Sequence, residues 1–239
     1  NKVLFSSDGK KLFIANRATG THSATGVSDS PLRMNRLNTP FDITTDRVKT
    51  DVNSGCGDLD GANPNDISGG DFGSDQLDNM HIANDGRTFF FVSTVGVIGK
   101  FNLSTPYDIG TMTYERKFSS GIAQIDSMHL SKDGKKLFLL NFTGNTPIVY
   151  THTLPAPFDI SSTTLTHEVD LVDKGIILTT GSNDMGVDIE FTPEGNAMFI
   201  MINNNHSKQN AARHGIQGNQ NYICLLYTSP SPRDRYGSR

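Results

Sequence analysis

The sequence predicts an all-β protein built from four-stranded antiparallel sheets, and three observations carry this prediction. The 239 residues are rich in turn formers, with 23 Gly and 10 Pro, and they contain no Trp. Apolar runs are short, several alternate with polar residues at a period of two, and helical periodicity is essentially absent. Above all, one pattern of strand, Asp-Gly turn and apolar strand recurs along the chain, and such a repeat decides the fold class.

The repeat consists of two blocks that recur in the same order. The first block occurs as NKVLFSSDGKKLFIAN from Asn1, DNMHIANDGRTFFFVS from Asp78, DSMHLSKDGKKLFLLN from Asp126 and, in a weaker copy, VDIEFTPEGNAMFIMI from Val187. The second block occurs as LNTPFDITT from Leu37, LSTPYDIGT from Leu103 and LPAPFDISS from Leu154. Two blocks in a fixed order are far beyond chance, so we take the units to start near residues 1, 78, 126 and 187.

The shortest complete repeat, Asp78 to Ile125, divides into four predicted strands. Met80 and Ile82 alternate with polar neighbours, and the Asp85-Gly86 pair that follows is typical of a hairpin turn. Thr88 to Ser93 is a β-rich run that leans apolar, as expected of a strand buried on both faces. Val97 to Leu103 and Met112 to Phe118 supply the third and fourth strands.

Four antiparallel strands in about 40–50 residues, repeated in tandem, are typical of a β-propeller blade. The repeats resemble the WD-like (WD40-like) and YVTN-like propeller repeats of bacterial proteins. They are especially similar to the L-S-T-P-[FY]-D-I-type repeats of marine microbial and phage reading frames. The resemblance covers nearly all of residues 1–223 and implies a fold rather than a function. The chain lacks the Trp-Asp pair of WD repeats, so a WD-type partner role is not carried over.

The last residues, 224–239, carry a different kind of sequence. CLLYTSPSPRD, from Cys224 to Asp234, resembles the translation of a sequencing adaptor found at the ends of metagenomic reading frames; the alternative is a genuine basic Ser/Pro tail. Without the three Arg and the one Asp of this segment, 18 basic and 24 acidic residues remain, a net charge of −6 instead of −4. Cys56 is then the only cysteine. Such a segment is excluded from fold reasoning.

Residues 1–223 are therefore expected to be an incomplete propeller from a longer protein. About four repeats are visible, whereas propellers close with about four to eight blades. We expect an open arc whose unpaired strand edges would promote aggregation.

Several recurring residues have an architectural explanation. Acidic residues precede a Gly at each turn between the first and second strands, where a carboxylate can accept backbone hydrogen bonds: Asp8, Asp85, Asp133 and Glu194. In the second block, Pro fixes the backbone, the aromatic fills space between blades and the Asp caps the turn, as in Phe41-Asp42, Tyr107-Asp108 and Phe158-Asp159.

The first strand of each repeat is the candidate functional region, because in propellers it lines the central channel. The channel-lining candidates are carboxylates and imidazoles at aligned positions, with Asp188 one place later than the other two Asp: Asp78, His81, Asp126, His129, Asp188 and Glu190. Such a ring could bind a divalent metal. The alternative is a wet channel whose polar groups satisfy one another and water.

A second candidate site lies in the insertion Gly55 to Asp75. Oxygen-bearing side chains cluster around Gly61 in a way that resembles calcium loops, with Asp58, Asp60, Asn63 and Asp66 as candidate ligands. The Asp-x-Asp-x-Asp-Gly order is not met and no Glu stands at the twelfth position, so a flexible acidic loop is the alternative. His22, His152 and His167 stand among polar residues and are expected to be solvated.

These observations limit the function. No apolar run of about 18 residues exists, which excludes a transmembrane helix, and the acidic balance argues against nucleic acid. No nucleophile elbow or Walker loop is present. The leading hypothesis is a non-enzymatic binding or structural module for a protein or glycan ligand, surface-displayed, secreted or virion-associated. The alternative is a calcium-dependent lactonase-like hydrolase, which would gather at least three ligands at one level of the channel.

Overall fold

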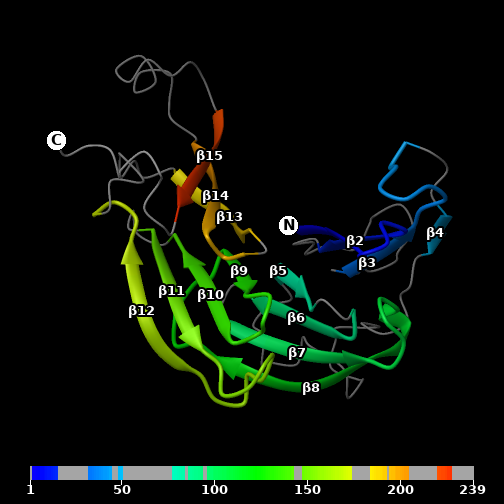
Figure 1. Ribbon diagram of the computed structural model, residues 1–239, viewed down its shortest axis with the longest axis horizontal. Helices are drawn as coiled ribbons and strands as arrows, with labels where there is room; N and C mark the ends of the chain where they lie inside the picture. The colour runs from blue at the N-terminus through cyan, green and yellow to red at the C-terminus, as the bar shows by residue number, and fades with distance from the viewer. Residues whose placement is uncertain are drawn as a thin grey trace, which may run out of the picture. The chain divides into compact units, whose positions relative to one another are not determined.

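The structure, a computed structural model, describes residues 2–15, 32–44, 48–50, 77–83, 86–93, 96–142, 147–173, 184–192, 194–204 and 220–227, and the statements below concern these residues. They form an all-β protein with one short 3₁₀ turn, η1 (Ile109–Thr111). Figure 1 shows four separate antiparallel sheets. The all-β class and the four-stranded antiparallel sheets predicted from the repeat are confirmed.

The strands follow the repeats. The first sheet contains β1 (Lys2–Phe5), β2 (Lys11–Ala15), β3 (Leu32–Arg36) and β4 (Val48–Thr50). The second contains β5 (Leu77–Ile82), β6 (Thr88–Ser93), β7 (Val97–Leu103) and β8 (Met112–Ser119). The third contains β9 (Ser127–Leu130), β10 (Lys136–Asn141), β11 (Ile148–Thr153) and β12 (Thr164–Asp170). The fourth contains β13 (Asp184–Phe191), β14 (Ala197–Asn204) and β15 (Gln220–Tyr227).

Each sheet is a meander whose strands pair in sequence order, so the first strand of every repeat lies at a sheet edge. The four strands predicted in the repeat from Asp78 match β5 to β8 within a few residues at their ends. In β6 every residue from Phe89 to Ser93 is buried, as the apolar run predicted. The period of two places Phe89 and Phe91 on one face and Phe90 and Val92 on the other.

The chain divides into two compact units, residues 1–125 with 158–162, and residues 126–157 with 163–239. We call the sheet face that carries the positions of Phe13 and Ala15 the far face, and the opposite face the near face. In the first unit the far face of β1–β4 packs on the near face of β5–β8, in a core that includes Phe13, Ala15, Leu32, Met34, Met80, Phe89, Phe91 and Phe101.

The second unit repeats this packing. Leu140 and Phe138, on the far face of β9–β12, pack with Ile189, Phe191 and Ile200 on the near face of β13–β15. The Phe138 and Phe191 ring centroids are 4.2 Å apart. The same face of the repeat thus covers the same face of the next sheet in both units.

The Asp-Gly turns have the predicted chemistry. Ser6 N donates to Lys11 O at 2.9 Å, and Gly9 adopts a φ of 68°. Asp8 Oδ1 accepts from Ser6 Oγ at 2.6 Å and from Lys10 N at 3.0 Å. The hydrogen bond from Ser6, followed by that from Lys10, lowers the pKa of Asp8 below its usual value.

Asp133 has the same partners, Ser131 and Lys135, and these hydrogen bonds lower its pKa in the same way. The fourth turn differs from the prediction. Thr192 Oγ1 donates to Asn196 Oδ1 at 2.8 Å, and Glu194 is exposed. The shorter Asn side chain on the other side of Gly195 takes the place that Asp occupies elsewhere. Asp85 lies outside the described residues.

The aromatic residues of the second block adopt left-handed backbone conformations, with φ values of 60° at Phe41, 57° at Tyr107 and 59° at Phe158. Bulky residues rarely adopt this conformation. The amide of Tyr107 donates to Gly86 O at 2.7 Å, and that of Phe41 to Gly9 O at 2.9 Å. The Phe41 and Tyr107 rings then lie over Gly9 and Gly86, so these two glycines are needed both for their φ and for their missing side chain.

The Asp of this block caps the turn as predicted. Asp108 Oδ1 accepts from Gly110 N at 3.0 Å, and Asp42 and Asp159 accept from the amides of Thr44 and Ser161 at 2.8 Å. The amide of Ser161, then its hydroxyl, lowers the pKa of Asp159. The block is therefore a fixed piece of scaffold.

The end of the chain contributes to the fourth sheet. In β15, Cys224 to Tyr227 pair with Ile200 to Ala197 of β14. Residues 228–239 lie outside the described residues. The assignment of residues 224–239 to an adaptor-derived tail concerns their origin and stays a prediction.

The contact between Gly86 and Tyr107 can be tested by substitution. A Cβ at residue 86 would lie 2.3 Å from Tyr107 Cε2, whereas a Cβ at Gly121, which has a similar φ of 74°, would meet nothing within 4 Å. We expect Gly121→Ala to lower the free energy of unfolding by about 1 kcal/mol, the cost of the left-handed backbone alone.

For Gly86→Ala we expect a loss of roughly 2–5 kcal/mol, because overpacking against the ring adds to the backbone cost. Urea unfolding of both variants measures the difference. Equal losses would contradict the role assigned to the Tyr107 ring.

Candidate functional site

The edge strands β9 and β13 are tied together by a hydroxyl–carboxylate contact. Ser127 Oγ donates to Asp188 Oδ1 at 2.7 Å and accepts from Ile189 N at 3.1 Å. Ile189 N also lies 3.0 Å from Asp188 Oδ1. Ser127 is fully buried, so this contact, which we call the serine clamp, satisfies polar groups away from water.

Two residues further along both strands, an imidazole and a carboxylate form a second contact. His129 Nδ1 lies 3.2 Å from Glu190 Oε1. The His129 side chain is 10% exposed, whereas that of Glu190 is 51% exposed. The contact is an ion pair when the ring is protonated, and solvent around Glu190 screens it. The His129 ring also lies 5.2 Å from the centroid of Phe191.

The predicted candidates are therefore brought together only in part. Asp188 and Glu190 lie beside Ser127 and His129, but Asp126 performs a structural task. Its amide donates to Leu140 O at 2.9 Å, and its Oδ2 accepts from Phe142 N at 2.7 Å. Asp126 thus fixes the chain at the ends of β9 and β10.

In the first unit the same positions carry different chemistry. Counted from the Asp-Gly turns, Lys2 and Asn79 occupy the position of Ser127 and Asp188, and both are buried, with 7% and 1% exposure. His81, half-buried, occupies the position of His129, and the side chain of Asp78 lies outside the described residues. The sequence analysis did not include Lys2 among the candidates. Its distance along the chain from Asp8-Gly9 is the signal that places it at the same position of the repeat as Asn79 and Ser127.

A charged cluster on the second sheet was also missed. Glu115 contacts Lys100 Nζ at 3.1 Å and Arg116 Nε at 3.0 Å, and it accepts from Asn102 Nδ2 at 2.8 Å. Partial burial alone would raise the pKa of Glu115, but the hydrogen bonds from Asn102 and Lys100, with the neighbouring positive charges, lower it. These contacts join β7 to β8, so the cluster is structural.

The described residues do not by themselves make up a metal site. Calcium takes about six to eight oxygen ligands, and within the described ranges no three or more His, Cys, Asp or Glu side chains form a group that could hold a metal ion. The predicted ligands Asp58, Asp60, Asn63 and Asp66 lie outside the described residues. The calcium loop stays a prediction.

The expectation that His152 is solvated is wrong. Its side chain is buried, with 4% exposure, and its Nδ1 lies 3.0 Å from Thr163 Oγ1. His152 pairs with Leu137 of β10, which is also buried, so its side chain lies on a covered face of the sheet. Burial lowers the pKa of His152. His167, on β12, is exposed as expected.

We expect the serine clamp to contribute measurably to stability. Ser127→Ala removes a donor to Asp188 and an acceptor for Ile189 N in a buried place, and should lower the free energy of unfolding by about 1–3 kcal/mol. Ser131→Ala is the matched control, because Ser131 makes a similar bond to Asp133 at an exposed turn. Ser131→Ala should lower the free energy of unfolding by less than about 1 kcal/mol. Chemical unfolding of both variants tests this, and a smaller loss at residue 127 than at 131 would refute it.

Burial of His152 also predicts a pH dependence. Because the pKa of the folded state is depressed, the unfolded chain binds the proton more readily below the ordinary value of about 6.5. The free energy of unfolding should therefore fall as pH drops below about 6.5, until the lowered pKa is reached. His152→Gln should flatten this part of the curve and His167→Gln should not. An unchanged slope in His152→Gln would count against the assignment.

No protein-family model matches the chain, and no curated protein matches its sequence. Among solved structures, it is similar to a functionally unknown protein from Desulfotomaculum acetoxidans, with 12% identity over 84% of this chain and 49% of that chain and a TM-score of 0.44. It is also similar to two proposed 6-phosphogluconolactonases. The one from Bacteroides uniformis has 14% identity over 95% and 57% of the two chains, with a TM-score of 0.42. The one from Bacteroides fragilis has 13% identity over 63% and 41%, with a TM-score of 0.36. The chain thus spans about half the length of the solved structures it matches.

Proposed function

We propose that the chain is part of a non-enzymatic β-propeller binding module whose ligand contacts the edge strands β9 and β13 of the second unit. The observation that supports this most is a contrast inside the repeat. The turn residues of the first and third repeats keep one chemistry, as at Asp8 and Asp133. The Asp residues of the second block also make the same kind of bond in each copy. The polar edge position changes from copy to copy, carrying Lys2, Asn79, Ser127 and Asp188.

Such a contrast suits recognition. A scaffold that is fixed by turns and packing can vary its edge side chains without changing the fold, and binding residues are often carried on such positions. Lys2, Asn79 and Ser127 are themselves buried, so a ligand would meet the position two residues further along the strand, which also differs between copies and is exposed at Glu190.

The accessible part of this surface is polar with an aromatic neighbour. Glu190 is half exposed, and its carboxylate lies 3.2 Å from the imidazole Nδ1 of His129. Phe191, next to Glu190, is also partly exposed. Carboxylate and imidazole beside an aromatic ring suit a polar ligand with some apolar surface, such as a peptide segment or a glycan.

The propeller assignment is part of this proposal. It is supported by meandering sheets with the first strand at an edge, and by consecutive sheets that pack face to face within each unit. The resemblance to WD-like, YVTN-like and L-S-T-P-[FY]-D-I-type repeats belongs to the same proposal. So does a surface-displayed, secreted or virion-associated setting. No helix in the described ranges has the length and apolar character needed to cross a bilayer.

The proposal predicts a ligand that depends on Glu190. The full chain is screened against a printed glycan array and a displayed peptide library, and the strongest binder is titrated against variants. Glu190→Gln should weaken binding roughly tenfold or more, because a hydrogen bond to a charged group is lost. Glu168→Gln makes the same charge change at an exposed residue of β12 and should bind like the wild type.

Equal affinity of the two variants would contradict the proposed contact surface. A calorimetric calcium titration runs beside the screen. Saturable calcium binding that Asp188→Asn abolishes would favour the lactonase-like hydrolase. That alternative stays a prediction, because it needs at least three ligands at one level and the side chain of one candidate, Asp78, lies outside the described residues.

A further inference from the structure

The near face of the β1–β4 sheet exposes large apolar side chains. Val3 is 55% exposed, Phe5 37%, Phe41 59% and Ile43 49%. The Phe5 and Phe41 ring centroids lie 5.4 Å apart, Val3 lies on the same face of β1 as Phe5, and Ile43 follows Phe41 by two residues, so we group the four side chains as one patch. We call it the Val3 patch. Contiguous apolar surface of this kind marks an interaction site more often than isolated apolar residues do.

The repeat shows what these positions do in the other sheets. The position of Val3 is held by Met80, Met128 and Ile189, which are 0%, 1% and 0% exposed. The position of Ile43 is held by Ile109 and Ile160, at 2% and 0%. The same positions of the repeat are therefore buried elsewhere and exposed only in the β1–β4 sheet among the described residues.

The chain also shows what covers such a face. In the first unit, the near face that carries Met80 and Ile109 is covered by the far face of the preceding sheet, through Phe13 and Met34. Lys11 Nζ adds hydrogen bonds to Pro106 O at 3.4 Å and Tyr107 O at 3.0 Å. In the second unit, Phe138 and Leu140 of a far face cover Ile189. The cover is each time the far face of another sheet of the same repeat.

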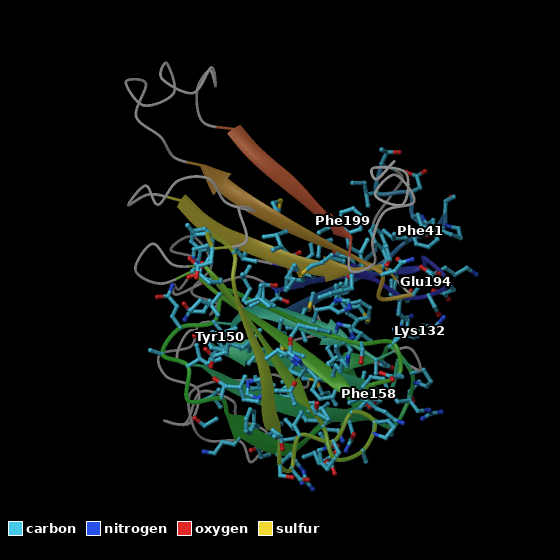
Figure 2. The ribbon with its side chains drawn as sticks, turned by 60° about the vertical axis from the view of Figure 1, so that its left-hand side comes forward. Phe41, Lys132, Tyr150, Phe158, Glu194 and Phe199 are labelled. Carbon is cyan, nitrogen blue, oxygen red and sulfur yellow. The ribbon has the colours of Figure 1, made fainter. Side chains whose placement is uncertain are left out.

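One far face is a suitable donor of this cover. On the β13–β15 sheet, Phe199 and Met201 occupy the positions of Phe13 and Ala15 and are only partly buried, whereas Phe13 and Ala15 are 0% exposed. Figure 2 labels Phe199 on this sheet and Phe41 in the Val3 patch. From this correspondence we propose that the Val3 patch binds the far face of the β13–β15 sheet of a second copy of the chain.

The packing inside each unit specifies the contacts of this interface. The ring centroids of Phe13 and Tyr107 lie 6.4 Å apart, and those of Phe138 and Phe191 lie 4.2 Å apart. The equivalent contacts join Phe199 of one copy to Phe41 and Phe5 of the other. Because two different surfaces meet, the contact is heterologous and extends to further copies unless the assembly closes.

The experiment is sedimentation velocity of the full chain over a wide range of protein concentration. The wild type should sediment faster as its concentration rises. The double variant Val3→Lys with Ile43→Lys should lose this shift, because ammonium groups cannot be buried against apolar rings without cost. Both positions are exposed, so the change should leave folding intact. Leu165→Lys, at another exposed apolar residue with 45% exposure, is the matched control and should associate like the wild type.

A mixing experiment completes the test, because each of two variants keeps the surface that the other has lost. Phe199→Glu should also abolish the shift, and mixing it with the Val3→Lys, Ile43→Lys variant should restore a mixed complex between the two. A monomeric wild type at every concentration would overturn the proposal. It would mean that another sheet or a different partner covers the patch. Association that survives the patch substitutions, or that Leu165→Lys abolishes equally, would overturn it as well. If Phe199→Glu does not fold, the comparison of the Val3→Lys, Ile43→Lys variant with Leu165→Lys still tests the proposal.

Discussion

The structure depends on one constraint, which is that the sheet faces that carry large apolar side chains must be covered by another sheet. β6 shows this most clearly, because Phe89 and Phe91 on one face and Phe90 and Val92 on the other are all fully buried. A sheet with a single covered face would leave large rings in water, at a cost of about 25 cal/mol for each Å² of apolar surface. The far face of one sheet therefore packs on the near face of the next, and this happens in the same way in both compact units.

The turns and loops hold the sheets in a shape that makes this packing possible. The aromatic ring of the second block lies over a glycine, its amide bonds to that glycine's carbonyl, and the following Asp caps the loop. A left-handed backbone at a bulky residue costs of order 1–3 kcal/mol and persists where surrounding contacts over-determine it. Since these contacts fix the scaffold, the edge positions are free to differ in chemistry, which is the basis of the proposed binding role.

Much of this fold is predictable because its determinants are local. The Asp-Gly pairs, the alternation in the first strand and the apolar run of the second strand specify β5 to β8 with little error. The left-handed φ of Tyr107 is not predictable, since no residue propensity favours an aromatic there. The burial of His152 follows from its place opposite the buried Leu137 of β10, which only the pairing of the two strands reveals.

The candidate site was predictable only in outline. Alignment of the repeats finds His129 and Glu190, which the structure places 3.2 Å apart. It misses the partner of Asp188, because Ser127 has no chemical feature that distinguishes it from a surface serine until the two edge strands lie side by side. The position of Asp126 in the repeat predicts a site residue. Its contacts are structural, since its carboxylate accepts a hydrogen bond from the backbone amide of Phe142.

Amide hydrogen exchange of the full chain tests the central claim, the packing of consecutive sheets face to face, most directly. If the far face of β1–β4 covers the near face of β5–β8, β2 and β6 should open together and exchange slowly at similar rates, because exposing one core exposes the other. Rapid exchange in β2 with full protection in β6 would mean that the second sheet is stable without the first. That result would contradict the account.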